Sequence, residues 1–189
     1  MEESPVNNGS NYLRFAAMIG TSMVVMFILM YFNTYAFEHV RWSETRFYMT
    51  FIMGAAMAVV MLSFMLGMYS DKKINAGIYI GSFVVLIAAL FLVRSQVTVG
   101  ERSYMNAMIP HHSIAIMTSE RAQIEDVRVR ELADEIIRAQ RREIKEMEWL
   151  VDDIRKNGIA ESQEEAEARP VPEFEGKLNP QEPSGSDVE

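Results

Sequence analysis

Apolar residues dominate the first half of the chain in three long runs. Residues 15–37, 47–69 and 74–93 contain no charged side chain. Each run has about 20 residues or more, which is enough for a helix to cross about 30 Å of hydrocarbon. Backbone groups inside a bilayer must bond to one another, so such runs form helices. The pattern predicts a membrane domain over 15–93 with three transmembrane helices, preceded by a flexible segment, 1–14.

The flanks of these runs indicate an orientation. The Lys and Arg residues near the three runs divide almost evenly between the two sides of the membrane, with a difference of one residue. The positive-inside rule therefore gives little information about the orientation. The short turn at Lys72–Lys73 stands opposite a belt of aromatic residues, formed by Tyr31, Phe32, Tyr35, Phe37 and Trp42. We therefore expect the turn to lie inside and the C-terminal half outside. The chain would be an integral protein of the plasma (inner) membrane with an extracytoplasmic C-terminal half.

Methionines recur at every fourth position of the second run, at Met49, Met53, Met57, Met61 and Met65. A step of four residues advances about 40° beyond a helical turn, so they form a slowly winding ridge. Met commonly fills irregular gaps between helices, which is the interpretation that we favour. The alternative is a thioether path for a soft metal such as Cu(I).

The second half of the chain changes from uniform hydrophobicity to helical periodicity. After a connector at 94–100, the region 101–158 predicts a hairpin of two helices. The first helix, from Glu101 to about Gln123, is apolar nearly all round and contains Pro110. The second begins at Glu125–Asp126, ends at Gly158, and has a heptad-spaced seam of Ala133, Ile137, Gln140, Ile144, Met147, Val151 and Ile154. The expected fold class is all-α.

Two helices of this length enclose too little core to be stable alone, because domains of this size are marginal. Two copies can pair into a four-helix bundle, which would bury the apolar first helix on more than one side. We therefore expect a homodimer or a larger homo-oligomer.

Histidine and methionine side chains gather on the first hairpin helix. His112 lies one turn after Met108 and two turns after Met105, His111 lies one turn after Met108 on the neighbouring side, and Met117 lies further along. Imidazole and thioether ligands together suit copper, especially Cu(I), better than Mg²⁺ or Ca²⁺. On the opposite helix, Met147 and Glu143 are candidates for further ligands or supporting partners. The alternative is structural: the histidines bond to Glu143 or Gln140 and bind no metal.

Composition narrows the possible functions. The chain has 15 Met and no Cys, which excludes disulfides, thiolate zinc sites, iron–sulfur clusters and a Cys nucleophile. Most of the net charge of −8 belongs to residues 159–189, an acidic and Pro-containing tail that we expect to be disordered. The rest is nearly neutral and has no basic patch, so nucleic acid is not an expected partner.

Two runs resemble a known family. Residues 104–117 (YMNAMIPHHSIAIM) and 139–150 (AQRREIKEMEWL) are similar to the signature of domain-of-unknown-function family 305. The resemblance covers about residues 101–155. It implies a ferritin-superfamily fold built from a repeated two-helix unit, of which one unit is present here. It also implies a bacterial protein, secreted or membrane-anchored, in a family with some members associated with copper handling.

Together these observations predict a membrane-anchored protein that binds or sequesters copper through His111, His112 and nearby Met. The competing hypothesis is an oligomerisation module without metal. We expect no enzyme, with a redox enzyme as the third alternative: di-iron ferritin-like sites use Glu-x-x-His motifs, and none occurs in this sequence. The third histidine, His39, follows the first apolar run and is interpreted as a belt residue rather than an accessory ligand.

Overall fold

The computed structural model describes residues 8–179, which form helices and no strands. The chain divides into two compact units. One contains the residues up to Phe32 together with Glu44–Val99, and the other contains Asn33–Ser43 together with the residues from Gly100 onward. The all-helical prediction is confirmed for the described residues.

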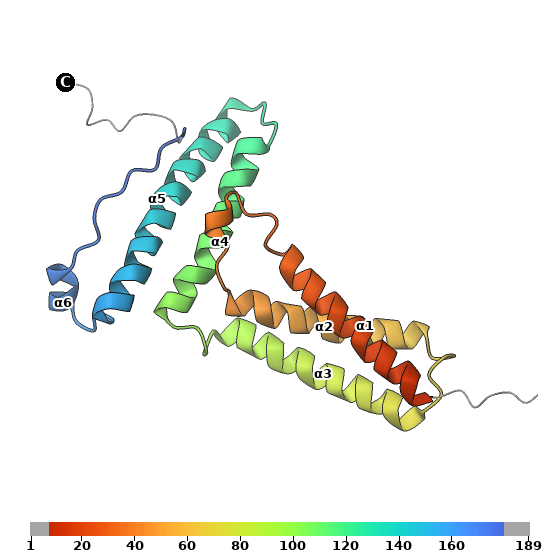
Figure 1. Cartoon of the computed structure of the whole chain (residues 1–189). Coiled ribbons are helices and arrows are strands. Elements are labelled where there is room, and N and C mark those ends of the chain that lie inside the picture. The colour runs from red at the N-terminus through yellow and green to blue at the C-terminus, as the bar shows by residue number, and fades with distance from the viewer. Residues whose placement is uncertain (1–7, 180–189) are drawn as a thin grey trace, which may run out of the picture. The chain divides into compact units, whose positions relative to one another are not determined.

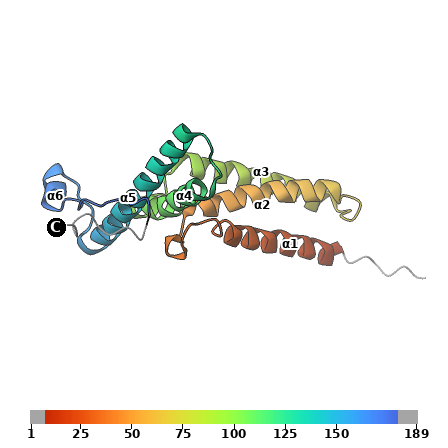
Figure 2. The ribbon, with the colours of Figure 1, turned by 90° about the horizontal axis from the view of Figure 1, so that it is seen from above.

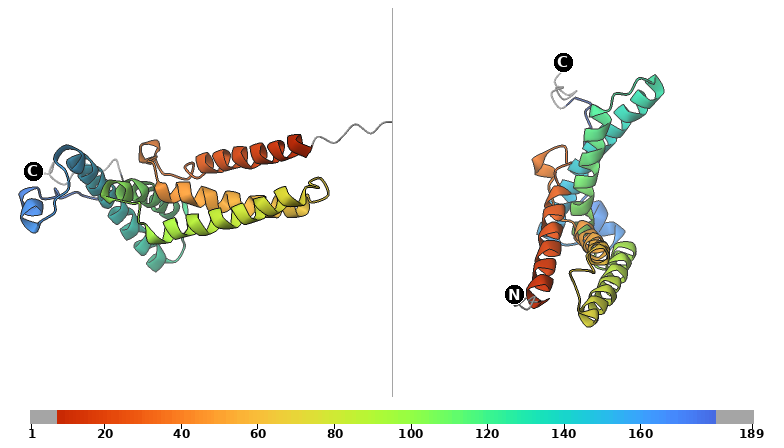
Figure 3. Two further views of the ribbon diagram at one scale, coloured as in Figure 1. Left: turned by 90° about the horizontal axis from the view of Figure 1, so that it is seen from below. Right: turned by 90° about the vertical axis from the view of Figure 1, so that its right-hand side faces the viewer.

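The first unit consists of α1 (Asn8–Leu29), α2 (Glu44–Phe64) and α3 (Lys72–Ser95). Helix α2 lies between the other two and contacts both (Figure 2). Helices α2 and α3 run side by side in opposite directions (Figure 3). All three helices are long and apolar enough to cross a membrane.

Small residues of α2 allow its neighbours to approach. Gly54, Ala55 and Ala58 are buried, and a Cβ atom added to Gly54 would lie 2.4 Å from the sulfur of Met23. Close approach over small residues is typical of helix packing in lipid. Met61 and Met65 pack against the core of this unit, which supports the packing interpretation of the methionine ridge at these two positions.

The first apolar helix differs from its predicted range. It begins at Asn8, within the segment expected to be flexible, and ends at Leu29 rather than Phe37. Residues 1–7 lie outside the described part. The shift has a tertiary cause, because residues 33–43 leave the helix and pack with the second unit, where Phe37–His39 forms the 3-10 helix η1.

The second unit is a hairpin of α4 (Glu101–Arg121) and α5 (Val127–Asn157), which pack along each other (Figure 1). Its buried core contains Met105, Ile109, Ile116, Ile137, Ile144 and Met147. Asp126 caps α5 by accepting a hydrogen bond from the backbone N–H of Arg128 at 2.9 Å. Gly158 follows α5 with a φ of 81°, a conformation that favours glycine at a helix end. Both helices lie within the region 101–158 that the sequence predicted as a hairpin, and α4 continues through Pro110 as one helix.

The acidic tail is more ordered than its composition suggested. Within residues 159–179, α6 (Gln163–Ala168) is followed by an extended segment that runs back along α5 (Figure 1). Lys145 Nζ donates to the carbonyl of Glu175 at 2.9 Å, and Leu178 packs against the hairpin core. Composition alone could not reveal the bond between Lys145 and Glu175, because its acceptor is a backbone carbonyl. Residues 180–189 lie outside the described part.

Candidate functional site

The site is centred on His112, which α4 presents to α5. Its Nδ1 atom lies 3.2 Å from Oε2 of Glu143, and the exposed fractions of the two side chains are 13% and 36%. The contact satisfies an ion-pair distance but not hydrogen-bond geometry, and the buried Nδ1 has no hydrogen-bond partner among the described residues. A nitrogen that is close to a carboxylate but misaligned with it is not satisfied by that carboxylate.

Burial also determines the charge of this histidine. Loss of hydration lowers the pKa of His112, and the neighbouring His111 adds to that lowering, whereas the Glu143 carboxylate opposes it. The imidazole is therefore neutral near pH 7. A neutral ring nitrogen carries the lone pair that a metal ion requires.

His111 lies on the same helix as His112, but its side chain points in a different direction. Its side chain is exposed, its ring centroid lies 6.1 Å from that of His112, and the two ring planes are tilted by 58°. The adjacent imidazoles therefore have different surroundings, one buried against α5 and one open to solvent.

The candidate methionines lie mainly in the hairpin core. Met105 and Met147 are buried in it, Met108 packs against it, and Met117 is half-buried. Among residues 8–179, no group of three or more His, Asp or Glu side chains is arranged to hold a metal ion. One hairpin thus provides a His112–Glu143 pair rather than a complete coordination shell.

A second polar cluster surrounds Ser113, which sequence reasoning missed. Ser113 is completely buried, and its Oγ accepts a hydrogen bond from the backbone N–H of Tyr35 at 2.7 Å. His39 Nδ1 lies 2.8 Å from the same oxygen. Because the hydroxyl already accepts one bond, its own proton can be donated to Nδ1 of a neutral His39. Burial lowers the pKa of His39, with Glu148 and Glu38 opposing this and Arg41 adding to it.

This finding changes the interpretation of His39. The sequence placed it in an aromatic belt, whereas in the structure it packs against α4 within the second unit. No local pattern could have indicated the contact, because the two residues are 74 positions apart.

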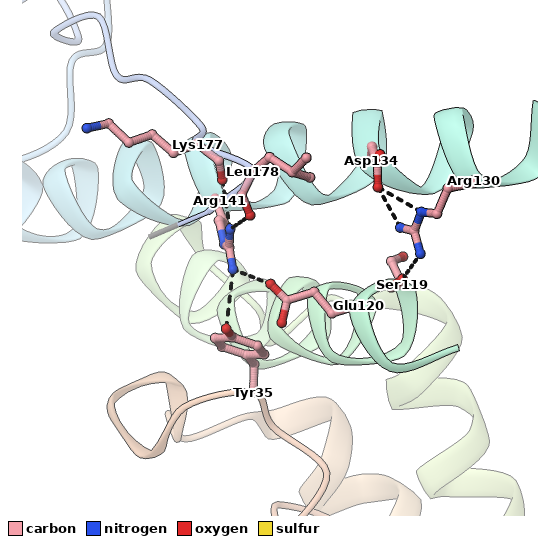
Figure 4. Close-up of polar contacts among 8 residues, drawn as sticks. All are labelled: Tyr35, Ser119, Glu120, Arg130, Asp134, Arg141, Lys177 and Leu178. Carbon is pink, nitrogen blue, oxygen red and sulfur yellow. Dashed lines mark hydrogen bonds and ion pairs between the residues drawn. The ribbon is translucent and has the colours of Figure 1, made fainter. Parts of the chain in front are cut away.

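A cavity of about 370 Å³ adjoins this cluster and is lined in part by Tyr35, His39, Ile116, Ile144 and Glu148. Arg141 forms one side of it. The Arg141 guanidinium pairs with Glu120 and donates to the hydroxyl of Tyr35 and to the carbonyls of Lys177 and Leu178 (Figure 4).

Comparison with known protein families gives a match over the part of the chain that contains the hairpin. Residues 92–181 match the family described as Domain of unknown function (DUF305). Uncharacterized protein L153 of Acanthamoeba polyphaga mimivirus is 34% identical over 104 residues, which cover 51% of this chain and 68% of that protein. The chain belongs to the DUF305 family. No solved structure matches it.

The DUF305 region contains α4, α5, α6 and every candidate ligand named above. It extends beyond the stretch of resemblance seen in the sequence, into the last residues of α3 and into the tail segment along α5. Helices α1 and α2 lie outside it.

Proposed function

We propose that this DUF305 protein is a membrane-anchored metal-binding protein that sequesters, senses or delivers copper. The observation that carries the proposal is the buried Nδ1 of His112, which lacks a hydrogen-bond partner and faces a carboxylate. A buried nitrogen without a hydrogen-bond partner destabilises the folded chain unless another interaction satisfies it. Coordination of a metal ion is one such interaction.

The donor set fits a transition metal. His112 supplies a neutral imidazole and Glu143 a carboxylate, while His111 and Met108 stand one residue and one turn before His112. Met105, Met117 and Met147 would add thioethers that favour copper, although the two that are buried in the core would have to give up contacts there.

Dimerisation would complete the set. A metal held by four ligands needs two such His112–Glu143 pairs, and a second hairpin provides the other pair. Tyr104, Val129 and Leu132 leave 55%, 48% and 56% of their surfaces exposed on the hairpin. Burying them between two copies would form a four-helix bundle of the ferritin-like kind. We therefore propose a homodimer, with α1–α3 spanning the plasma (inner) membrane and the hairpin on its extracytoplasmic side.

The second candidate function is an oligomerisation module in which His112 is structural. The 3.2 Å approach of His112 to Glu143 favours it, since an imidazole beside a carboxylate is a common structural pair. The two hypotheses predict different consequences of removing the imidazole.

Anaerobic titration with Cu(I) separates them. The full chain is purified in detergent and titrated against a competing chelator, as wild type, His112→Ala and Glu143→Gln. His39→Asn is the matched control, because it removes an imidazole outside the pair. We expect micromolar or tighter binding, one ion per two chains, that is lost in His112→Ala and kept in His39→Asn. Equal binding by wild type and His112→Ala, or none by either, would overturn the metal function.

A further inference from the structure

Residues 33–43 form a segment with two different faces. Tyr35, His39 and Arg41 point toward the hairpin, as the contacts of their side chains with Arg141, Ser113 and Glu148 show. Three apolar side chains of the same segment remain exposed: Phe37 at 90%, Trp42 at 54% and Val40 at 38%. Val40, which follows η1, has an extended backbone, and successive side chains of extended chain point to opposite sides, so Val40 points away from His39 and Arg41. Phe37 lies in η1 and is exposed from that turn.

Polar contacts hold the inward row in place. The Ser113 hydroxyl engages both the backbone N–H of Tyr35 and the ring of His39, and Arg41 pairs with Glu148 at 3.2 Å. The outward row cannot turn toward the hairpin without breaking these contacts. Exposure of the three apolar side chains is therefore built into the segment.

Chain connectivity indicates what covers them. The segment joins the end of α1 to the start of α2, and Arg46 ties those two ends together. Its Nη1 donates to the carbonyl of Met30 at 3.0 Å, and its guanidinium lies 4.5 Å from the centre of the Tyr31 ring. A loop between two spans whose ends are joined in this way emerges at the membrane surface, where Trp and other aromatic side chains are favoured.

We propose that Phe37, Val40 and Trp42 insert into the boundary between lipid headgroups and acyl chains, while the opposite face of the same segment clamps the hairpin. The inference rests on the proposed membrane anchoring and is independent of metal binding.

Tryptophan fluorescence tests the lipid contact directly. The chain has two tryptophans, so Trp149→Phe leaves Trp42 as the only reporter, and Trp42→Phe leaves Trp149 of α5 as the comparison. Each variant is reconstituted in vesicles whose lipids carry bromine either near the headgroup or near the acyl terminus. We expect Trp42 emission to be quenched severalfold more by the shallow bromine than by the deep one.

Ser113→Ala tests the clamp. The variant lacks the hydroxyl that accepts from Tyr35, so we expect amide hydrogen exchange at Tyr35 to be about fivefold faster, the ratio that corresponds to one net hydrogen bond. Quenching of Trp42 should persist. Unchanged exchange at Tyr35 would overturn the clamp.

Flotation of the vesicles identifies which proposal fails. A chain that does not float with lipid, or that alkaline carbonate extracts, would overturn the membrane anchor and this inference with it. A chain that floats but shows no Trp42 quenching would overturn only the inference. Quenching that appears only after dissociation of a dimer would overturn it in favour of a second copy as the covering surface.

Discussion

Replacement of His112 by leucine provides a stability test of the site. In the metal-free protein, leucine removes a buried nitrogen that has no hydrogen-bond partner. An unsatisfied buried polar atom costs about 1–3 kcal/mol, and leucine is also a slightly better helix former than histidine. Glu143 is 36% exposed and stays hydrated, so loss of its neighbour costs little. We expect the free energy of unfolding to rise by about 1–2 kcal/mol.

Binding of Cu(I) should reverse the order of stability of wild type and His112→Leu. A ligand present at a hundred times its dissociation constant stabilises the folded state by about 2.7 kcal/mol, and only the wild type would gain this. The wild type should therefore be the less stable protein in chelator and the more stable one with Cu(I).

Urea unfolding in detergent measures both conditions. Trp42→Phe serves as the background, so that Trp149 of α5 reports on the hairpin alone. His111→Gln is the matched control, because this exposed neighbour should change metal-free stability by less than about 0.5 kcal/mol.

Two results would refute the reasoning. If His112→Leu is less stable than wild type in chelator, the imidazole is a satisfied structural residue and the cost assigned to its nitrogen is wrong. If Cu(I) stabilises wild type and His112→Leu equally, binding occurs elsewhere.

Two further predictions concern pH and packing. Burial lowers the folded-state pKa of both His39 and His112, so the unfolded chain binds more protons than the folded one as the solution is acidified. The contribution of these histidines to the free energy of unfolding should therefore be complete above the ordinary histidine pKa of about 6.5 and should fall as the pH drops below it. The drop in urea midpoint between about pH 7.5 and about pH 5.5 should shrink when both histidines are replaced by glutamine, and an unchanged drop would assign it to other groups. Ile137 is 2% exposed in the hairpin core. Its replacement by alanine should lower the free energy of unfolding by about 2–5 kcal/mol, and its replacement by valine should lower it by about 0.5–1.5 kcal/mol. The same assay on Val127→Ala, a 79% exposed position, should show a change below about 0.5 kcal/mol, and a cost equal to that of Ile137→Ala would contradict the assigned core.

Features that depend on neighbouring residues could be predicted from the sequence. The heptad spacing of α5 placed Ala133, Ile137, Ile144 and Met147 on its buried side, and these four are its buried residues. The limits of that helix were also predictable, since caps act within a few residues of a helix end. The approach of Glu143 to His112 followed from hairpin geometry, because two long helices joined by a short turn must lie antiparallel.

Features that depend on distant residues were decided by tertiary structure. The apolar run that ends at Phe37 looks like one continuous span, yet the chain leaves the helix after Leu29 because Tyr35 and His39 find a buried hydroxyl at Ser113. The acidic tail looks disordered, yet part of it lies along α5 because Lys145 binds its backbone carbonyl at Glu175. Hydrophobic periodicity and caps belong to short stretches of sequence. A buried hydroxyl or a backbone carbonyl carries no such pattern, so its partner is chosen only when the chain folds.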